Sequence, residues 1–368
     1  MQIDFHHTVT YVLARATGFN HEEADIISHA AQYVDDAVRS GAIRFDNDAM
    51  YTRISSAHKI IDPHTLDNWG DLLVWVPFHF LPGNGGMPAG QDPDGSFIHK
   101  IICKPGSDVA REMVAACICD QNKPYALHRL GVTMHVYADT WAHQGFAGVL
   151  HQINEVRHAE DVGNSGAFGT LDNVLTAFLA PAIPAVGHGQ ARELPDMPFL
   201  SWRYTNGAGE VIERDNTAIF LEAADEMCKA MQRFRLKNPG ANVPGLPEDY
   251  GELIRTRMAN MKTADSARRH EQWLADLAAG AFPFGSVALE YSETTWIADA
   301  LEIEPSEAAA AGAGPGMSGG TAATLDFHRY HYRTQFLSSD WKLYHDALQL
   351  HRLTVLHDIL PKYGICSG

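Results

Sequence analysis

The sequence predicts an all-α fold, a bundle of many helices with long loops and little β structure. Apolar residues recur with a helical period along much of the 368-residue chain. The strict alternation that is typical of strands is scarce, and only a small hairpin is expected around residues 200–212. We therefore expect helices to build the core and to carry the functional side chains.

Seven helical stretches are expected, in chain order. The second begins after Asn20, which is a suitable N-cap because Glu23 follows three residues later and completes a capping box. The last is stopped by Pro361. The stretches cover residues 7–17, 21–38, 106–120, 124–147, 213–236, 246–279 and 340–359.

This organisation divides the chain into three parts. Residues 1–304 are expected to form the main helical domain, which also holds the candidate metal ligands described below. Residues 305–323 are rich in Ala, Gly and Ser and predict a flexible loop. Residues 324–368 are expected to form a C-terminal helical segment that packs on the main domain.

Composition narrows the classes of function. The chain has 45 acidic and 28 basic residues and a formal net charge of −17. A nucleic-acid-binding surface normally needs a basic footprint, so no strong surface of that kind is expected. The 20 histidines against 5 cysteines favour imidazole and carboxylate ligands over a thiolate site.

The cysteines and the N-terminal residues predict a cytoplasmic location. The five cysteines are odd in number and scattered, without a C-x2-C pair, as expected for reduced thiols. The first residues show no basic segment followed by an apolar run and a cleavage site. No stretch approaches the roughly 18 apolar residues of a transmembrane segment.

The most informative segment is 128–155, where His135, Asp139 and His143 recur every four residues. Four residues advance a helix by about 40° beyond a full turn, so the three side chains share one face. Imidazole nitrogens and a carboxylate oxygen together suit zinc or a similar first-row ion. The other face carries residues expected in the core: Leu130, Met134, Tyr137 and Trp141.

Helix geometry limits how these residues can share an ion. His135 and His143 lie about 12 Å apart along the helix axis. Both cannot reach one zinc ion, whose bonds to nitrogen and oxygen measure about 2.0–2.2 Å. Asp139 lies midway and can share an ion with either histidine. The spacing therefore predicts two or more ions, or one ion and a bystander histidine.

The string from Leu130 to Phe146 resembles the central helix of the zinc-dependent phospholipase C/P1 nuclease superfamily. Its pattern Leu-Gly-x3-His-x3-Asp-x3-His-x2-Phe is typical of the heterokaryon-incompatibility-type branch. The whole chain is also similar to an uncharacterised bacterial family, DUF6765. The superfamily resemblance covers roughly residues 1–200, and it implies a multi-helix bundle with two or three zinc ions between helices. This chain lacks the N-terminal tryptophan that ligates a metal in secreted phospholipases C.

The resemblance implies two ligands near the N-terminus. The early histidine corresponds to His6, with His7 as the alternative. The aspartate at the end of the second helix corresponds to Asp35, with Asp36 as its neighbour. Acidic side chains at a helix C-terminus oppose the helix dipole, and a bound cation would offset that cost.

A third ligand is implied within Trp75-Val-Pro-Phe-His-Phe-Leu-Pro-Gly, which we interpret as an apolar loop. His79 in this segment matches the His-Phe-x2-Pro stretch of the superfamily. His58 is the competing candidate, because the chain distance from Asp35 to His79 is long.

Two sets of partners are available for His143. One is His151 with Glu155, an H-x3-E pair expected on one helical face. The other is His188, between two glycines, with Asp196, which resembles the Gly-His…Pro-Asp stretch of the heterokaryon-incompatibility branch. Glycines on both sides would let the backbone approach a buried ion closely.

The function expected from these ligands is hydrolysis of a small-molecule or lipid phosphoester or phosphodiester. Zinc, or another divalent first-row metal, would activate water and polarise the phosphoryl oxygen. Asp35 and Asp139 are the candidate catalytic carboxylates, Asp35 as the base and Asp139 between the ions. The alternative is a non-enzymatic metalloprotein with structural zinc or a partner-binding cleft.

Overall fold

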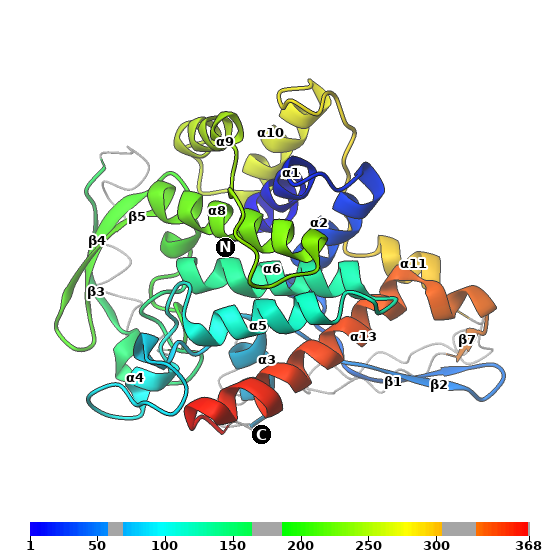
Figure 1. The fold of residues 1–368 in the computed structure, drawn as a ribbon, viewed down its shortest axis with the longest axis horizontal. Helices are drawn as coiled ribbons and strands as arrows, with labels where there is room; N and C mark the ends of the chain where they lie inside the picture. The colour runs from blue at the N-terminus through cyan, green and yellow to red at the C-terminus, as the bar shows by residue number, and fades with distance from the viewer. Residues whose placement is uncertain (58–68, 164–185, 304–328, 367–368) are drawn as a thin grey trace, which may run out of the picture.

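The computed structural model describes residues 1–57, 69–163, 186–303 and 329–366. It shows a mixed fold, in which helices are accompanied by a four-stranded and a three-stranded sheet at opposite ends of the long axis (Figure 1). The prediction of an all-α fold is therefore wrong. The predicted flexible loop over 305–323 lies outside the described residues.

Helices form most of the described structure, and every predicted helical stretch contains one. The long pattern over 246–279 is divided into two helices, and three shorter helices were not predicted: α3, α4 and α11. The α-helices are α1 (Thr10–Ala16), α2 (His21–Asp36), α3 (Trp69–Phe78), α4 (Ile98–Ile101), α5 (Asp108–Cys119), α6 (Ala126–Ala142), α8 (Asn216–Leu236), α9 (Glu248–Asn260), α10 (Ser266–Ala278), α11 (Thr295–Ala300) and α13 (Asp340–Leu353). Shorter turns are the π-helical η1 (Asp4–Val9) and η7 (Thr354–Ile359) and the 3-10 segments η2 (Asn84–Gly86), η3 (Gln152–Asn154), η5 (Leu194–Asp196), η6 (Thr334–Ser338) and η8 (Leu360–Tyr363).

The sheets explain why the strand content was underestimated. The three-stranded antiparallel sheet is β3 (Val156–Asp161), β4 (Ser201–Asn206) and β5 (Val211–Asp215), and its β4–β5 hairpin confirms the one predicted near 200–212. The second sheet has the order β2 (Met50–Arg53), β1 (Gly41–Phe45), β7 (Arg329–His331) and β6 (Glu302–Ile303). Its strands β1 and β7 pair in parallel across most of the chain length. Strands of only two to six residues leave little periodic signal.

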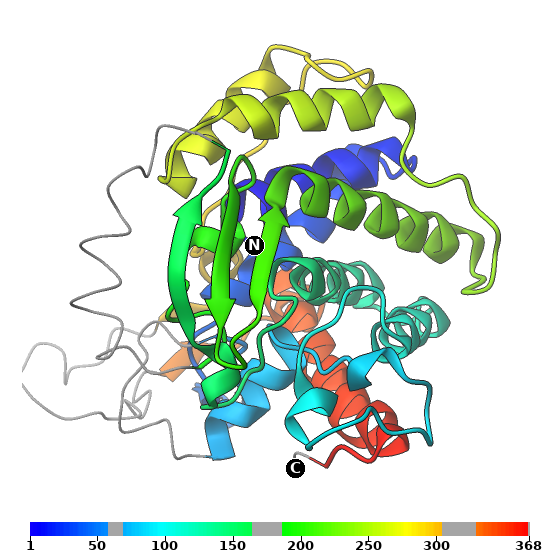
Figure 2. The same cartoon turned by 90° about the vertical axis from the view of Figure 1, so that its left-hand side faces the viewer.

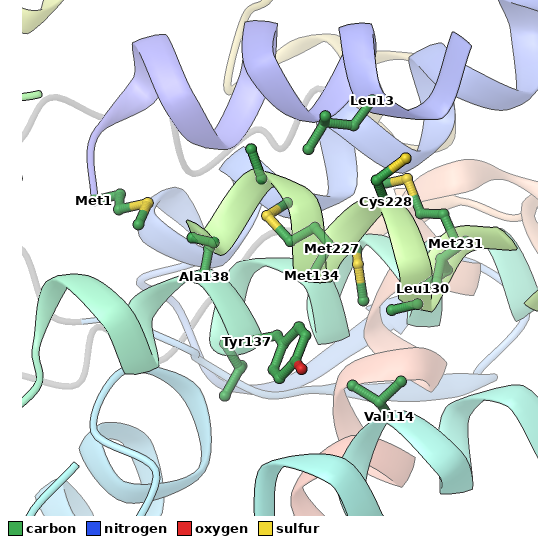
Figure 3. Close-up of a cluster of buried hydrophobic side chains, with 14 of the residues drawn as sticks. Met1, Leu13, Val114, Leu130, Met134, Tyr137, Ala138, Met227, Cys228 and Met231 are labelled. Carbon is green, nitrogen blue, oxygen red and sulfur yellow. The ribbon is translucent and has the colours of Figure 1, made fainter. Parts of the chain in front are cut away.

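Helix α6 crosses the middle of the molecule and forms the centre of the core (Figures 1 and 3). Its predicted apolar face is confirmed: Leu130, Met134, Tyr137 and Trp141 are all at most 3% exposed. Figure 3 shows this face against Met227, Cys228 and Met231 of α8. Leu13 of α1 and Val114 of α5 belong to the same cluster. Burying each large apolar side chain contributes about 1.5–3 kcal/mol to folding. The packed face fixes α6, and with it the polar face that carries the ligands.

Helix α2 packs closely against α6. Asn20 and Glu23 form the predicted capping box at its start, with both hydrogen bonds at 2.9 Å. Farther along, Gly131 of α6 lies so near α2 that a Cβ there would approach the Ile27 carbonyl oxygen to 2.3 Å. This approach places the C-terminal end of α2, with Asp35, beside the ligand face of α6.

Figure 2 views the molecule from the end with the three-stranded sheet, with α9 and α10 above α8. Among the described helices, none has the length and hydropathy that crossing a bilayer requires.

We predict that Gly131→Ala destabilises the protein by about 2 kcal/mol or more, because the added methyl group overlaps backbone of α2. Urea unfolding monitored by circular dichroism measures this. Gly251→Ala on α9 is the matched control: its methyl group would meet only Leu246, at 3.6 Å, and it should leave stability unchanged or slightly higher. Equal effects of the two substitutions would contradict the close α2–α6 packing.

Candidate metal centre

Histidine and aspartate side chains from five parts of the chain converge beside the C-terminal half of α6. They come from η1, the end of α2, the residue after α3, α6 with its C-cap, and the segment 186–196. Their ligand atoms form three groups, and within each group these atoms all lie within 4.8 Å of one another: His6, Asp35 and His135; His79, His135 and Asp139; His143, His188 and Asp196. His135 and His143 fall in different groups, as the helical spacing predicts.

The carboxylate of Asp139 lies at the centre and is 1% exposed. Its Oδ2 is 3.3 Å from His135 Nε2 and 3.4 Å from His79 Nδ1. Its Oδ1 is 3.2 Å from His6 Nε2 and accepts a 2.6 Å hydrogen bond from the Met1 nitrogen. Although burial opposes its charged form, His143 and the Met1 ammonium group hold the pKa of Asp139 well below its usual value. Asp139 is therefore a carboxylate anion at neutral pH.

Four of the histidines are oriented by backbone carbonyl groups. A carbonyl oxygen only accepts, so the ring nitrogen that contacts it must carry the proton, and the other nitrogen of the neutral ring is free to ligate. The donors are His135 Nδ1 to Ala31 at 2.8 Å, His79 Nε2 to Ser56 at 2.9 Å, His143 Nδ1 to His79 at 2.7 Å and His188 Nδ1 to Arg192 at 2.6 Å. The remaining nitrogens are the ones that face Asp139 and Asp196, at 3.3–3.6 Å.

His6 gives independent evidence that the centre fits a cation. Its ring stacks on His135 at 3.8 Å between centroids. Both of its nitrogens are buried and make no hydrogen bond within the described structure, and the nearest carboxylate oxygen to Nε2 is that of Asp139, at 3.2 Å. Buried polar atoms in proteins nearly always have a partner, and a bound ion would provide one. Burial lowers the pKa of both His6 and His135 to about 4. At neutral pH these rings are therefore neutral, which is the form that binds metals.

The group around His143 is held by close packing. The His143 ring stacks on Phe80, and the backbone of Gly187 lies next to the tip of the Phe80 ring. Gly187 has a φ of +50°, and a Cβ there would lie 2.2 Å from that ring, so glycine is required. The adjacent His188 therefore reaches Asp196, and Asp196 lies 3.2 Å from the Met1 nitrogen.

Seven of the nine predicted ligands thus lie together, and two do not. The chain leaves helical geometry at His143, the C-cap of α6, so the expected helical face with His151 and Glu155 does not form. His151 instead accepts a hydrogen bond from the Ile153 backbone, and Glu155 pairs with Arg157. None of the three donor groups found among the described residues includes them.

The alternative ligands have other partners. His7 lies next to His6 in the π-helical turn, but it faces His270, with 2.9 Å between the ring nitrogens. Asp36 accepts hydrogen bonds from Gln32 and Tyr291. His58 lies outside the described residues. The interpretation of the His79 segment as a loop is wrong up to Phe78, because α3 continues to that residue and His79 follows its end.

A cavity of about 770 Å³ opens onto the centre. Its walls include Asp35, whose side chain is 33% exposed against 1% for Asp139. Sequence reasoning missed Met1 and Tyr291, which also line the cavity. No motif could have indicated Tyr291, because it lies some 255 residues from its partner Asp36.

A comparison with known protein families assigns the chain to one of them. The profile of DUF6765, described as a family of unknown function, matches residues 1–359. The chain belongs to the DUF6765 family. No curated protein and no solved structure matches it. Membership in DUF6765 confirms the second resemblance seen in the sequence, while the resemblance to the phospholipase C/P1 nuclease superfamily stays a prediction.

We predict that metal-free protein loses stability as the pH falls from about 6.5 to about 4. The folded-state pKa of His6 and His135 is lowered to about 4, so the stability linked to their neutral form is full above 6.5 and is lost toward 4. Each buried ring contributes up to about 3 kcal/mol to this dependence. Urea unfolding of chelator-treated protein across this pH range measures it.

The contribution of His6 is isolated by His6→Gln, which should flatten the pH dependence of the unfolding free energy. His357→Gln changes an exposed histidine on η7 and serves as the control. Parallel curves for wild type and His6→Gln would contradict the assignment.

Proposed function

We propose that this DUF6765 protein is a metal-dependent hydrolase that cleaves a phosphoester or phosphodiester at the His/Asp centre. The observation that carries the proposal is the orientation of His79, His135, His143 and His188. Each donates one ring N–H to a backbone carbonyl and presents the other nitrogen to a buried carboxylate. This arrangement, in which an outer partner fixes the tautomer of a ligating imidazole, is typical of protein metal sites.

The donor set supports zinc, or another divalent first-row metal, in two or three positions. All donors are imidazole nitrogens and carboxylate oxygens, which suit such ions. His135 and His143 belong to separate donor groups, so one ion cannot satisfy both. Bound ions would supply positive charge beside a phosphoryl group and lower the pKa of water there.

Asp35 and Asp139 are proposed to have different roles in the reaction. Asp35 is the proposed base, because it is the donor carboxylate most open to the cavity. The proposed role of Asp139 is to connect the donor groups, because its oxygens lie near histidines from more than one of them. A structural zinc site is closed by four protein ligands, whereas an open cavity beside Asp35 supports a catalytic one.

The charge of the protein supports a small-molecule or lipid phosphoester as substrate. Five carboxylates, and no lysine or arginine, are found among the described residues that line the cavity: Asp35, Asp36, Asp139, Asp196 and Glu293. With a net charge of −17, a long polyanion such as nucleic acid would be repelled outside the cavity. The superfamily resemblance of the α6 motif supports the same class of reaction.

We also place the protein in the cytoplasm. All five of its cysteines are unpaired thiols, three of them buried: Cys103, Cys117 and Cys228. Unpaired thiols suit a reducing compartment.

We predict at least two zinc-like ions per chain in protein never exposed to chelator or nickel resin, measured by mass spectrometry. Asp139→Asn should remove at least one of them, because it takes the central negative charge from the donor groups. Asp358→Asn, at an exposed position on η7, is the control and should keep the full content. Fewer than one ion per wild-type chain would rule out the proposed centre.

We predict that the metal-loaded protein hydrolyses a phosphodiester such as bis-p-nitrophenyl phosphate, with activity that rises through about pH 7 and is lost on chelation. Asp35→Asn should lower kcat by about 100-fold or more, because the amide cannot accept the proton. Release of p-nitrophenol measures both. If fully loaded protein cleaves no ester in a broad panel of phosphomonoesters, phosphodiesters and phospholipids, the non-enzymatic metalloprotein replaces this proposal.

A further inference from the structure

A second set of polar groups lines the same cavity beside the metal centre. Asp36 Oδ2 accepts a 2.6 Å hydrogen bond from the Tyr291 hydroxyl group and a 3.1 Å hydrogen bond from Gln32 Nε2. Gln32, Asp36 and Tyr291 all line the cavity. We refer to these three residues as the acceptor corner.

The hydrogen-bond polarity of this corner is fixed. Asp36 only accepts, so Tyr291 and Gln32 must both direct their donors to it. The Tyr291 oxygen keeps its lone pairs, and the amide oxygen of Gln32, which is 5% exposed, has no hydrogen-bond partner in the described structure. The corner therefore offers mainly acceptors to a molecule in the cavity, because the only N–H or O–H donor of these three side chains that is not directed to Asp36 is the second N–H of the Gln32 amide.

The Tyr291 ring contacts two histidine rings. It packs against His29 at 4.7 Å and His7 at 5.1 Å between ring centroids. Burial and the charge of Asp36 raise the pKa of Tyr291 well above its usual value, so the hydroxyl group keeps its proton. A rigid aromatic hydroxyl with a fixed orientation is suited to discriminating between ligands.

The position of the corner tells which part of a substrate would reach it. Asp36 follows Asp35 directly on α2, so the Cα atoms of these two residues lie about 3.8 Å apart. Asp35 belongs to the metal centre and Asp36 to the acceptor corner. A phosphoryl anion is attracted to bound cations and repelled by the Asp36 carboxylate. The corner is therefore placed for the leaving group of the ester and not for its phosphoryl group.

On the basis of the proposed function, we propose that the acceptor corner selects phosphoesters whose leaving group carries hydrogen-bond donors, either hydroxyl or primary ammonium. A site built to bind a donor discriminates against an analogue that lacks it, because the buried acceptors are then left unpaired.

The test is calorimetric binding to the full, zinc-loaded chain, with four probes. sn-Glycerol 3-phosphate carries hydroxyl donors, ethanolamine phosphate carries an ammonium donor, choline phosphate carries the charge without an N–H group, and methyl phosphate carries neither. We expect at least one donor-bearing probe to bind about five- to tenfold more tightly than methyl phosphate, the effect of about one hydrogen bond. The probe that does so distinguishes hydroxyl from ammonium recognition.

Tyr291→Phe keeps the ring contacts with His7 and His29 and should remove most of this preference. Asp36→Asn, which replaces the acceptor with an amide, should do the same and is the second variant. Tyr363→Phe is the matched control, because the Tyr363 hydroxyl group also bonds a carboxylate, that of Glu112 at 2.8 Å, but lies outside the cavity lining. Metal content and the midpoint of thermal unfolding are measured on every variant to show that it is folded and loaded.

The inference is overturned if wild-type protein shows no preference, if Tyr291→Phe retains it, or if choline phosphate binds as tightly as the tighter-binding of the two donor-bearing probes. Cleavage of bis-p-nitrophenyl phosphate is assayed on the same preparations. Cleavage without a Tyr291-dependent preference overturns this inference and leaves the proposed hydrolase standing. A Tyr291-dependent preference without cleavage of any ester overturns the hydrolase and leaves donor recognition standing.

Discussion

The buried carboxylate of Asp139 is the interaction on which the rest of the centre depends. An unpaired charge in a protein interior costs several kcal/mol, so Asp139 needs positive or polarised partners around it. The structure brings these partners from elements far apart in the sequence: the Met1 nitrogen, His6 of η1 and His79 after α3. One negative charge on α6 thereby fixes where the N-terminal segment and the end of α3 must lie.

Backbone carbonyl groups set the orientation of four of the imidazole rings. The carbonyl of Ala31 within α2 receives the His135 proton, and it is in reach because Gly131 lets α2 approach α6. The His79 carbonyl receives the proton of His143, so one donor residue orients another. Ligand atoms held in this way need little rearrangement when a cation enters, and this preorganisation is what metal affinity and catalysis both require.

The sequence revealed the parts of the centre that local periodicity encodes and missed those that depend on distant contacts. His135, Asp139 and His143 share one helical face by spacing alone, and the apolar face opposite to them is equally periodic. Strands β1 and β7 pair across most of the chain, and Tyr291 meets Asp36 only through the folded chain. His151 and Glu155 were misplaced for a local reason, since α6 ends at Ala142 and the helical spacing assumed for them does not hold.

The balance of charge around the cavity determines whether cations or substrate would bind first. Among the described lining residues, the Met1 ammonium group stands against five carboxylates, and Asp139 and Asp196 outweigh burial to raise its pKa to about 11. Without divalent cations the cavity therefore repels a phosphoryl anion. Two bound divalent ions would bring four positive charges to the donor groups, while the Asp36 carboxylate lies beside them in the acceptor corner. Under the proposed function, metal binding would precede substrate binding and would also orient the substrate, with its anion at the ions and its leaving group at the acceptor corner.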